Sequence, residues 1–308
     1  MPDKVLVTGG MGFIGSHLCD ALTDKGYEVV VVRNLSTGGS LDNVRKAQEA
    51  GGVLLKGGSI LDLDFLKSVM HEVKVVFHLA AINRAIRSIQ DPIGANAINI
   101  TGTLNVLVAA RDCGVRKVIY SSSSSVYGEI SGEKSEDMLP CPCSPYAVGK
   151  LAGECYCDVF SKQYGLNTVS LRYFNIYGPR QDAKADYAAV IPKFIDSMLH
   201  DKPPMIYGDG EQTKDFTYVK DAVVANLLFS ENDSQGVFNI GTGMNITING
   251  LVSLLNSIMG KDIKPVYCSE RPGDFKYSLA NISKARKAGY EPRYTLESGL
   301  KETIASFR

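Results

Sequence analysis

The beginning of the chain, "KVLVTGGMGFIGSHL" at residues 4–18, gives the clearest indication of the fold. A short β-branched run leads into Gly9, Gly12 and Gly15, and an amphipathic segment follows from Phe13 to Lys25. Between a strand and a helix, such glycines permit a tight turn, let a pyrophosphate approach the backbone and let helix and strand pack closely. The helix N-terminus then faces the negative charge of the pyrophosphate. This context predicts nucleotide binding, although glycines alone would also fit a plain tight turn.

Further apolar runs alternate with segments of helical character, at 27–33, 53–57, 74–80, 117–122 and 167–175. Nearly all-apolar strands separated by helices imply a parallel sheet covered on both faces. We therefore predict an α/β fold in which a doubly wound, parallel-sheet Rossmann domain spans residues 1–174 and 219–240. Elsewhere the alternation loosens and Pro and Gly become frequent, so residues 175–218 and 241–308 are predicted to form a smaller α/β substrate domain.

The composition is that of a soluble globular protein. The chain has 308 residues, of which 44% are hydrophobic and 21% charged. Lys plus Arg and Asp plus Glu both total 33, so no net basic field favours nucleic acid or an anionic membrane. The apolar run at the N-terminus is too short for a signal-peptide core or a membrane span. We therefore expect a cytoplasmic protein.

The cysteines and histidines show no metal-site spacing. Seven cysteines is an odd number, which favours reduced thiols over a disulfide framework. Cys141-Pro-Cys143 and Cys155-Tyr-Cys157 lack the Cys-x-x-Cys spacing of structural zinc sites, and the second pair falls in a probable helix, where i and i+2 face apart. Because the four histidines are also scattered, we predict no metal site.

The end of the second predicted strand bears on the choice of cofactor. An acidic side chain there would bond the 2′-hydroxyl of NAD, but this chain has Arg33. A cation favours the extra phosphate of NADP, whereas an arginine that points to solvent or stacks on the adenine is equally compatible with the pattern. Asp62, after the third strand, is either an adenine contact or a helix N-cap.

Five serines, residues 121–125, follow an apolar run and precede Val-Tyr-Gly. A Ser-rich patch is usually a flexible linker, but this one ends a strand at the carboxyl edge of the sheet, where ligands bind in such folds. Further along, Tyr146 and Lys150 are four residues apart and would share a helix face. A lysine ammonium near a phenol favours the phenolate, so the tyrosine could act as a base near neutral pH.

Other motifs join these along almost the whole length, including "VFHLAA", "NITGTLNVL", "SPYAVGK", "LRYFNIYGPRQ", "YGDGEQTKDFTYVKD", "NIGTG" and "RPGD". In this combination the chain resembles an extended short-chain dehydrogenase/reductase, and within that group the nucleotide-sugar 4-epimerases. The resemblance implies a UDP-sugar substrate, a retained NAD cofactor and a homodimer. Its four-helix interface would use helices near Gly94–Asp112 and Tyr146–Tyr164.

The resemblance also implies roles for single residues. Ser123 matches the serine that hydrogen-bonds the sugar O4, Tyr146 the base, and Lys150 the group that holds the nicotinamide ribose. Lys214 stands where the family commonly has arginine, so it can neutralise phosphate but lacks the bidentate fork. The implied cofactor contacts are Gly9, Gly12, Phe13, Ile14, Gly15, Arg33, Asn34, Ile60, Asp62, Leu79, Ala80, Ala81, Asn99, Tyr146, Lys150 and Tyr173. The implied substrate contacts are Ser123, Ser124, Tyr146, Asn175, Tyr207, Lys214, Arg271, Asp274 and Ser278.

The serine run limits the chemistry that the resemblance implies. Related 4,6-dehydratases and decarboxylases carry an acidic residue just before Val-Tyr-Gly, where this chain has Ser124 and Ser125. Without a second acid or base, the chemistry reduces to reversible hydride transfer at C4. Tyr146 would take the C4 hydroxyl proton, the 4-keto sugar would turn about its pyrophosphate linkage, and the hydride would return to the opposite face.

The size of the sugar is predicted from the residue four beyond the Gly-Asp of "RPGD". In the family this position borders the 2-substituent of the sugar, and a bulky tyrosine there is associated with sugars that lack N-acetyl. Here it is Ser278, which favours UDP-GlcNAc/UDP-GalNAc interconversion, alongside UDP-Glc/UDP-Gal. If the register differs by one residue, Tyr277 is the neighbour and the inference reverses.

Two alternatives stay open from the sequence. An NADP-dependent nucleotide-sugar reductase would fit Arg33 and would need added cofactor for each turnover. A catalytically silent protein that senses NAD(P) is a second alternative, which the intact Ser123, Tyr146 and Lys150 disfavour.

Overall fold

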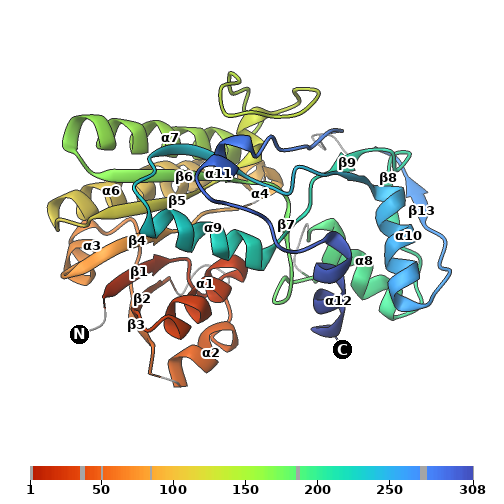
Figure 1. The fold of residues 1–308 in the computed structure, drawn as a ribbon, viewed down its shortest axis with the longest axis horizontal. Coiled ribbons are helices and arrows are strands. Elements are labelled where there is room, and N and C mark those ends of the chain that lie inside the picture. The colour runs from red at the N-terminus through yellow and green to blue at the C-terminus, as the bar shows by residue number, and fades with distance from the viewer. Residues whose placement is uncertain are drawn as a thin grey trace.

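A seven-stranded parallel sheet, flanked by helices, forms the larger part of the molecule, on the left in Figure 1. The structure is a computed structural model, which describes residues 3–34, 39–49, 51–83, 85–184, 188–270 and 276–307, with residue 46 as backbone only. The order across the sheet is β11-β6-β5-β4-β1-β2-β3, and every pairing is parallel. Its strands are β1 (Lys4–Thr8), β2 (Glu28–Arg33), β3 (Val53–Gly57), β4 (Val73–His78), β5 (Lys117–Ser123), β6 (Asn167–Tyr173) and β11 (Gly236–Ile240).

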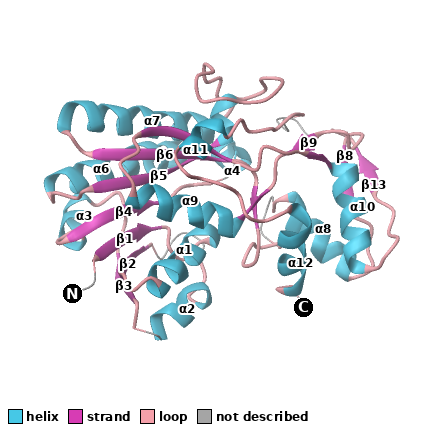
Figure 2. Cartoon of the chain, viewed as in Figure 1, coloured by secondary structure: helices cyan, strands magenta, loops and turns pink. Residues whose placement is uncertain are grey.

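Helices connect these strands and continue into the C-terminal part of the chain (Figure 2). They are α1 (Phe13–Asp24), α2 (Asp42–Glu49), α3 (Leu63–Val69), α4 (Ala85–Gln90), α5 (Pro92–Asn96), α6 (Thr103–Asp112), α7 (Pro145–Tyr164), α8 (Val190–Leu199), α9 (Val219–Glu231), α10 (Ile248–Met259), α11 (Ser283–Lys287) and α12 (Leu296–Ala305). Two shorter turns of other types are the π-helical η1 (Ala97–Gly102) and the 3₁₀-helical η2 (Ser124–Tyr127).

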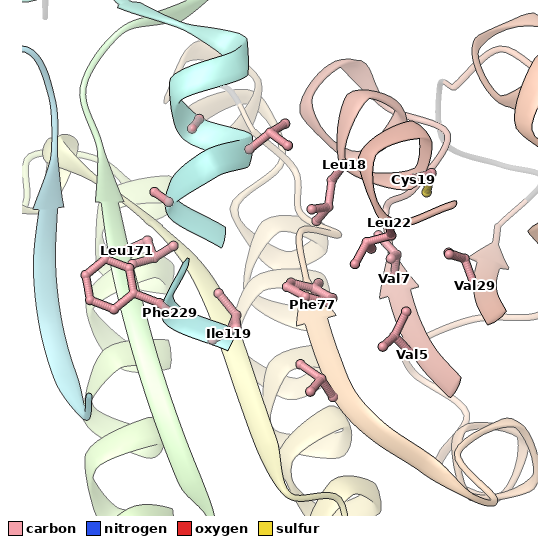
Figure 3. Close-up of a cluster of buried hydrophobic side chains, with 14 of the residues drawn as sticks. Val5, Val7, Leu18, Cys19, Leu22, Val29, Phe77, Ile119, Leu171 and Phe229 are labelled. Atoms are coloured by element: carbon pink, nitrogen blue, oxygen red, sulfur yellow. The ribbon is translucent and has the colours of Figure 1, made fainter. Parts of the chain in front are cut away.

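Successive strand residues supply separate cores on the two faces of the sheet. Val5 and Val7 of β1 belong to the core beneath α1, α2 and α9, whereas Leu6 belongs to the core beneath α3, α6 and α7. Figure 3 shows part of the first core, in which Leu18 of α1 and Phe229 of α9 lie over the strands. Burial on both faces explains why the strands are nearly continuous apolar runs. The predicted doubly wound α/β fold is confirmed.

The predicted helix near Gly94–Asp112 is interrupted in the structure. It consists of α5, the π-helical η1 and then α6. Within η1, the amide of Asn99 is bonded to the main chain of Ile82, and a Cβ on Gly102 would collide with the side chain of Ile60. π-helical turns of this kind are frequent at functional sites. The extra residue in the turn is not visible in the apolar pattern of the sequence.

The segment Pro92–Asp112 is, among the described residues, the one helical stretch long and apolar enough to cross a membrane by length and composition alone. In its most apolar window, 44% is buried within the protein, and α6 supplies Val106 and Leu107 to the core on the sheet. A core helix passes the same test, so we interpret the segment as part of the packed fold.

The strand order reverses between β1 and β4, because β2 and β3 lie on one side of β1 and β4 lies on the other. Ligands in such sheets bind beyond the carboxyl ends of the strands at this switch point. The loops after β1 and β4 therefore define where a cofactor would lie.

Residues 176–270 add three two-stranded sheets beyond the carboxyl edge of the large sheet (Figure 1). They pair β7 (Ile176–Tyr177) with β10 (Thr217–Tyr218), β8 (Met205–Tyr207) with β13 (Val266–Cys268), and β9 (Thr213–Lys214) with β12 (Ile246–Thr247). A third core joins α8, α10 and α12.

The positions of Ala285 and Tyr290 differ from the predicted division into two domains. Both belong to the core on the large sheet, although they lie in the range 241–308 that the sequence assigns to the substrate domain. The division into two domains itself stays a prediction.

Candidate active site

The loop after β1 is shaped to approach a ligand closely. Gly9 has a φ of +72°, and a Cβ there would lie 2.8 Å from the backbone nitrogen of Ala80, in the loop after β4. A Cβ on Gly15 would collide with the carbonyl oxygen of Gly9, so larger residues at either position would displace backbone. Glycine is required at both positions because only it combines this conformation with this packing.

The first turn of α1 can receive an anion. Gly12 caps the helix without a side-chain hydrogen bond, and no acidic residue lies in the first turn. The backbone N–H groups there therefore have no capping side chain, which is the arrangement that binds a pyrophosphate at a helix N-terminus. The residues present fit a dinucleotide, with Gly9, Gly12 and Gly15 beside the diphosphate.

A buried histidine supports the two loops from behind. The Nδ1 atom of His78 is 2.7 Å from the Thr8 hydroxyl, and its Nε2 atom is 2.9 Å from the Thr103 hydroxyl. The Thr8 hydroxyl also accepts a hydrogen bond from the backbone N–H of Ala80. Burial, aided by the charge of Lys150, lowers the pKa of His78 to about 3, so the ring is neutral at working pH. This network fixes the strand ends that the cofactor would contact.

The other predicted cofactor contacts lie along the same edge. Arg33 ends β2 and is followed by Asn34, and Ile60 lies after β3, while Leu79 follows β4. Ala81 comes two residues later in the β4 loop.

Two predicted contacts already have structural partners. Asp62 accepts a hydrogen bond from the Phe65 N–H at 2.9 Å, so the N-cap interpretation is observed and the adenine contact stays a prediction. Asn99 accepts from the N–H of Ile82 at 2.8 Å and donates to its carbonyl at 3.0 Å. Its side chain therefore orders the loop after β4, and any cofactor contact by Asn99 stays a prediction.

The catalytic segment begins where β5 ends. Ser123 closes the strand, and its hydroxyl caps the 3₁₀ turn η2 by accepting a hydrogen bond from the N–H of Ser125. The serines are thus ordered in a strand end and a helical turn rather than in a flexible linker.

The start of α7 brings Tyr146 to the same place. Ser144 caps the helix by accepting from the N–H of Ala147, and Pro145 occupies the first turn. The N–H of Tyr146 donates to the hydroxyl of Ser88 at 2.9 Å, which pins α7 to α4. The sequence therefore sets the position of Tyr146 through a cap, a proline and one buried serine.

Glycines let α7 pack against its neighbours. A Cβ on Gly149 would lie 2.8 Å from the Cβ of Asn99, and a Cβ on Gly153 would collide with the ring of Tyr120. This close packing places Lys150, one turn after Tyr146, in the interior.

Lys150 is buried, and its ammonium donates to the carbonyl of Ser121 at 2.6 Å. The Nζ atom is 5.8 Å from the ring centroid of Tyr146. Burial lowers the pKa of Lys150 to about 8, which the nearby Glu154 opposes.

Burial also raises the pKa of Tyr146, while hydrogen bonding to Ser123 lowers it. Lys150 is not among the groups that shift this pKa in the protein without a bound cofactor, so its effect on the phenol stays a prediction.

The serine run contacts a buried ion pair, Arg172–Glu154, that the sequence analysis did not identify. Arg172 donates to both carboxylate oxygens of Glu154, at 2.9 and 2.7 Å, and both side chains are only 4% exposed. Ser122 donates to the same carboxylate. Burial opposes the charge of Arg172, but hydrogen bonds and the charge of Glu154 raise its pKa. The spacing Tyr146, Lys150, Glu154, four residues apart each time, was the available signal.

Beyond these elements lies a cavity of 360 Å³. It is lined by Phe13, Ile14, Asn83, Ser122, Ser123, Ser124, Ser125, Gly128, Lys134, Tyr146, Tyr173, Asn175, Ile176, Gln181, Lys214, Tyr277 and Ser278. The structure therefore brings cofactor and substrate residues predicted from distant motifs to one cavity. Tyr207 is not among the described lining residues, and its role stays a prediction.

Asn175 and Ser278 form a connected wall of this cavity. The amide of Asn175, whose φ is +37°, donates to the Asp215 carbonyl at 2.8 Å and to the Ser278 hydroxyl at 3.0 Å. Ser278 is 7% exposed, whereas Tyr277 is 53% exposed and also lines the cavity. The small side chain is thus the more enclosed of the two.

The remaining predicted residues differ in what the structure describes. Tyr173 lines the cavity, and its hydroxyl lies 3.2 Å from the Ser121 hydroxyl and accepts from Asn226 at 2.7 Å. Burial raises the pKa of Tyr173 to about 12. The predicted substrate contacts Arg271 and Asp274 lie outside the described residues.

Lys134, Gln181 and Asn83 line the cavity but were not singled out from the sequence. Lys134 reaches the cavity by pairing with residues near 280, and no local pattern carries that contact. Only Glu154, among the residues missed, had a periodic signal.

The cysteines are all free in the structure. Cys155 is exposed and Cys157 buried, as expected for residues two apart on the helix α7. Among the residues that the structure describes, no group of three or more His, Cys, Asp or Glu side chains could hold a metal ion.

Comparison with known proteins defines the class. Residues 5–241 match the model of the NAD dependent epimerase/dehydratase family. The chain therefore belongs to that family, as the resemblance in the sequence implied, and its cofactor is NAD. NADP binding through Arg33 stays a prediction.

Particular relatives extend this similarity over the full length. A putative UDP-glucose 4-epimerase of Methanocaldococcus jannaschii is 36% identical over 303 residues, 97% of each chain. A UDP-N-acetylglucosamine 4-epimerase from Methanobrevibacter ruminantium, solved with UDP-N-acetylmuramic acid, has a TM-score of 0.95 and 42% identity, covering 100% of this chain and 99% of that one. A UDP-glucose 4-epimerase from Thermus thermophilus, solved with NAD, has a TM-score of 0.90 and 35% identity, covering 99% and 98%.

Proposed function

We propose that this protein is an NAD-dependent 4-epimerase of UDP-sugars. The observation that carries the proposal is the cavity lining, in which Ser123 and Tyr146 meet and no described side chain is acidic. Similar proteins of known structure are named as UDP-sugar 4-epimerases, which supports the same substrate class. Elimination or decarboxylation would require a further acid or base near the serine run.

The residues of the chain divide the work of the reaction. Tyr146 accepts the proton of the C4 hydroxyl, Ser123 hydrogen-bonds the oxygen as it becomes a carbonyl, and Lys150 holds the nicotinamide ribose with a donor that Ser121 orients. Bound NAD would supply a hydride acceptor at the nicotinamide and would return the hydride. The cavity of 360 Å³ leaves space for the keto sugar to turn before that return.

We favour N-acetylated sugars as substrates. The enclosed side chain at the specificity position is Ser278, and its small size leaves room for a 2-substituent. The relative from Methanobrevibacter ruminantium is named as a UDP-N-acetylglucosamine 4-epimerase, which supports the same choice. UDP-Glc/UDP-Gal interconversion is proposed as a second activity, since a cavity that holds the larger sugar also admits the smaller one.

A nucleotide-sugar reductase is the competing proposal, and Arg33 is the observation in its favour. The guanidinium at the end of β2 would suit the additional phosphate of NADP. A reductase would release its cofactor after each turnover, whereas an epimerase regenerates it. Dependence on added cofactor therefore separates the two.

The test is proton NMR of UDP-GlcNAc mixed with purified protein and no added cofactor. We expect anomeric signals of UDP-GalNAc that rise to a stable ratio. An unchanged spectrum, followed by conversion of UDP-Glc, would show that Ser278 does not set the specificity as proposed. Turnover of either sugar only after NADPH is supplied would favour the reductase.

A variant of Tyr146 tests its role as the base. Tyr146→Phe keeps the ring but removes the hydroxyl, and we expect epimerisation to fall by about 10²- to 10⁴-fold. The NAD released on denaturation, measured per chain, separates a loss of proton transfer from a loss of cofactor, because Tyr146 is also a predicted cofactor contact. A variant that epimerises at the normal rate would remove Tyr146 from the mechanism.

We also propose a cytoplasmic homodimer with a four-helix interface formed by the segments Gly94–Asp112 and Tyr146–Tyr164, which correspond to α5 to α6 and to α7. Val148, Val159 and Tyr164 on α7 are 46%, 44% and 52% exposed, and Ile93, next to Gly94 in α5, is 83% exposed, which is apolar surface that a second copy would cover. Ile93→Asp should produce monomers in light scattering at micromolar concentration. A wild-type protein that is already monomeric would contradict the proposal.

A further inference from the structure

Lys134 is a buried cation in the wall of the cavity. It is 3% exposed, and its ammonium donates to the carbonyls of Ile130 and Tyr277 at 2.9 and 2.8 Å. An ammonium carries three hydrogens, so these two bonds leave one donor. No ion pair joins Lys134 to an acidic side chain of the described chain. A buried charge is costly unless an anion or several hydrogen bonds compensate it.

Ser125 provides a second incomplete group on the same cavity wall. Its hydroxyl oxygen is buried and has no hydrogen-bond partner among the described residues. Its backbone is held in η2, because its N–H donates to Ser123 at 3.1 Å. Buried hydroxyls are normally hydrogen-bonded, so an unpaired one in a binding cavity indicates a ligand acceptor or donor.

The backbone around Lys134 is fixed independently of its side chain. The N–H of Lys134 donates to the carbonyl of Leu279 at 2.9 Å, and its own carbonyl accepts from Asn281 at 2.9 Å. The side chain therefore begins from a rigid strand-like pairing with Ala280. A pre-positioned cation of this kind binds an anion with little loss of conformational entropy.

The two cations of the described lining, Lys134 and Lys214, come from different segments. Lys214 lies on β9, where a diphosphate contact is proposed, whereas Lys134 contacts the carbonyls of Ile130 and Tyr277. The segment Lys276–Ser278 is hydrogen-bonded to Thr213 of β9 and lies between the two, so the variants below must distinguish a contact of Lys134 with the sugar from one with the diphosphate. The described lining has no acid that would compete for Lys134.

We propose that Lys134 and Ser125 form a subsite for a carboxylate on the sugar, so that among N-acetylated UDP-sugars those that also carry an acid bind most tightly. This inference rests on the proposed function for the UDP-sugar class. The carboxylate has two chemical sources, an oxidised C6 of the ring or an acid attached to a ring hydroxyl through an ether. Two donors on one wall match the two oxygens of a carboxylate.

The experiment measures dissociation constants by titration calorimetry on the full-length purified protein. The ligands are UDP-GlcNAc, its C6 uronic acid and UDP-N-acetylmuramic acid, which carries its carboxylate on an ether. We expect one acid to bind about 10- to 100-fold more tightly than UDP-GlcNAc, the range for a hydrogen bond to a charged group. The acid that gains identifies the source of the carboxylate.

Variants separate binding from positioning. Lys134→Met should weaken the acidic ligand by about 10- to 100-fold and change UDP-GlcNAc by less than about twofold. Ser125→Ala should weaken the same ligand without loss of folding, since its hydroxyl has no partner to lose. Lys117→Met is the matched control, because this buried lysine also donates to a carbonyl, that of Asn232, but at the opposite end of β5.

Equal binding of acidic and neutral sugars by the wild type would overturn the inference. So would an equal loss for both ligands in Lys134→Met, since that result means that Lys134 either positions Tyr277 and Ser278 or contacts the diphosphate that both ligands share. The proposed function fails separately, if no UDP-sugar is epimerised in the NMR assay. Selective binding of an acid without epimerisation would keep the subsite and remove the epimerase assignment.

Discussion

Replacing Glu154 by alanine would leave Arg172 buried without its carboxylate. The wild-type guanidinium makes two hydrogen bonds to Glu154, at 2.9 and 2.7 Å, and is 4% exposed. Its Nη1 atom already has no hydrogen-bond partner. The stack of Arg172 on the Tyr127 ring, at 4.6 Å from the centroid, would remain but cannot replace a countercharge.

The expected loss of stability is about 3–5 kcal/mol, the cost of removing one partner of a buried ion pair. The contact with Tyr127 is present in both proteins, so it cancels from this difference. Arg172→Met with Glu154→Ala removes both charges, so the double variant should lose less than the sum of the single losses. The pair is thus expected to show positive coupling in a double-mutant cycle.

Urea unfolding followed by far-ultraviolet circular dichroism measures these differences. Asp158→Ala is the control, because Asp158 is on the same helix and pairs with Lys162 at 2.8 Å, but is 56% exposed. An exposed pair contributes little, so the control should unfold close to the wild type. A loss below about 1 kcal/mol for Glu154→Ala, with additive single effects, would refute the reasoning from burial.

Catalysis gives a second readout of the same change. Ser122 would lose its carboxylate acceptor, and the neighbouring Ser121 carbonyl holds Lys150 at 2.6 Å. We expect kcat to fall more than KM changes, since the serine run orients the reacting groups. An unchanged kcat in a folded Glu154→Ala protein would show that the ion pair is purely structural.

Three further predictions concern the cofactor, pH and the sugar. Gly15→Ala should weaken NAD binding by about tenfold, because the new Cβ would collide with the Gly9 carbonyl. The measurement is the amount of bound NAD per chain, and an amount equal to that of the wild type would contradict the prediction. The value of kcat/KM should decrease as pH rises through about 8, because burial lowers the pKa of Lys150 to that value and the amine is neutral above it. A pH–rate profile that stays flat from pH 7 to about 9.5 would argue against a charged Lys150. Ser278→Tyr should lower kcat/KM for UDP-GlcNAc, measured by initial rates, by about 10- to 100-fold through overpacking and should affect UDP-Glc less. Equal losses for the two sugars would mean that Ser278 does not border the 2-substituent.

The sequence predicts the large sheet well because its signals are local. Apolar runs, the glycine loop and the Tyr146–Lys150 spacing depend on neighbouring residues, and six of the seven observed strands agree with predicted ones to within two residues. The seventh strand, β11, was not predicted. The carboxyl edge then brings together residues such as Ser123 that motifs had already marked.

What sequence reasoning missed depends on contacts between distant segments. Lys134 reaches the cavity through a pairing near residue 280, and Arg172 meets Glu154 across β6 and α7. The burial that raises the pKa of Tyr146 also depends on tertiary structure, through the packing of α7. Such effects depend on tertiary structure, so no periodicity in the chain reports them.

The main-chain hydrogen bonds between residue 134 and residues 279 and 281 bear on how the sugar preference of the cavity can be changed. The groups that move protons lie on β5 and α7, whereas the wall near the sugar combines a loop after η2 with a segment more than a hundred residues later. The bonds that join residue 134 to residues 279 and 281 are between main-chain groups, so a new side chain in that wall need not break them. The sugar preference can therefore be altered by substitution in the wall while Tyr146 and Lys150 keep their positions.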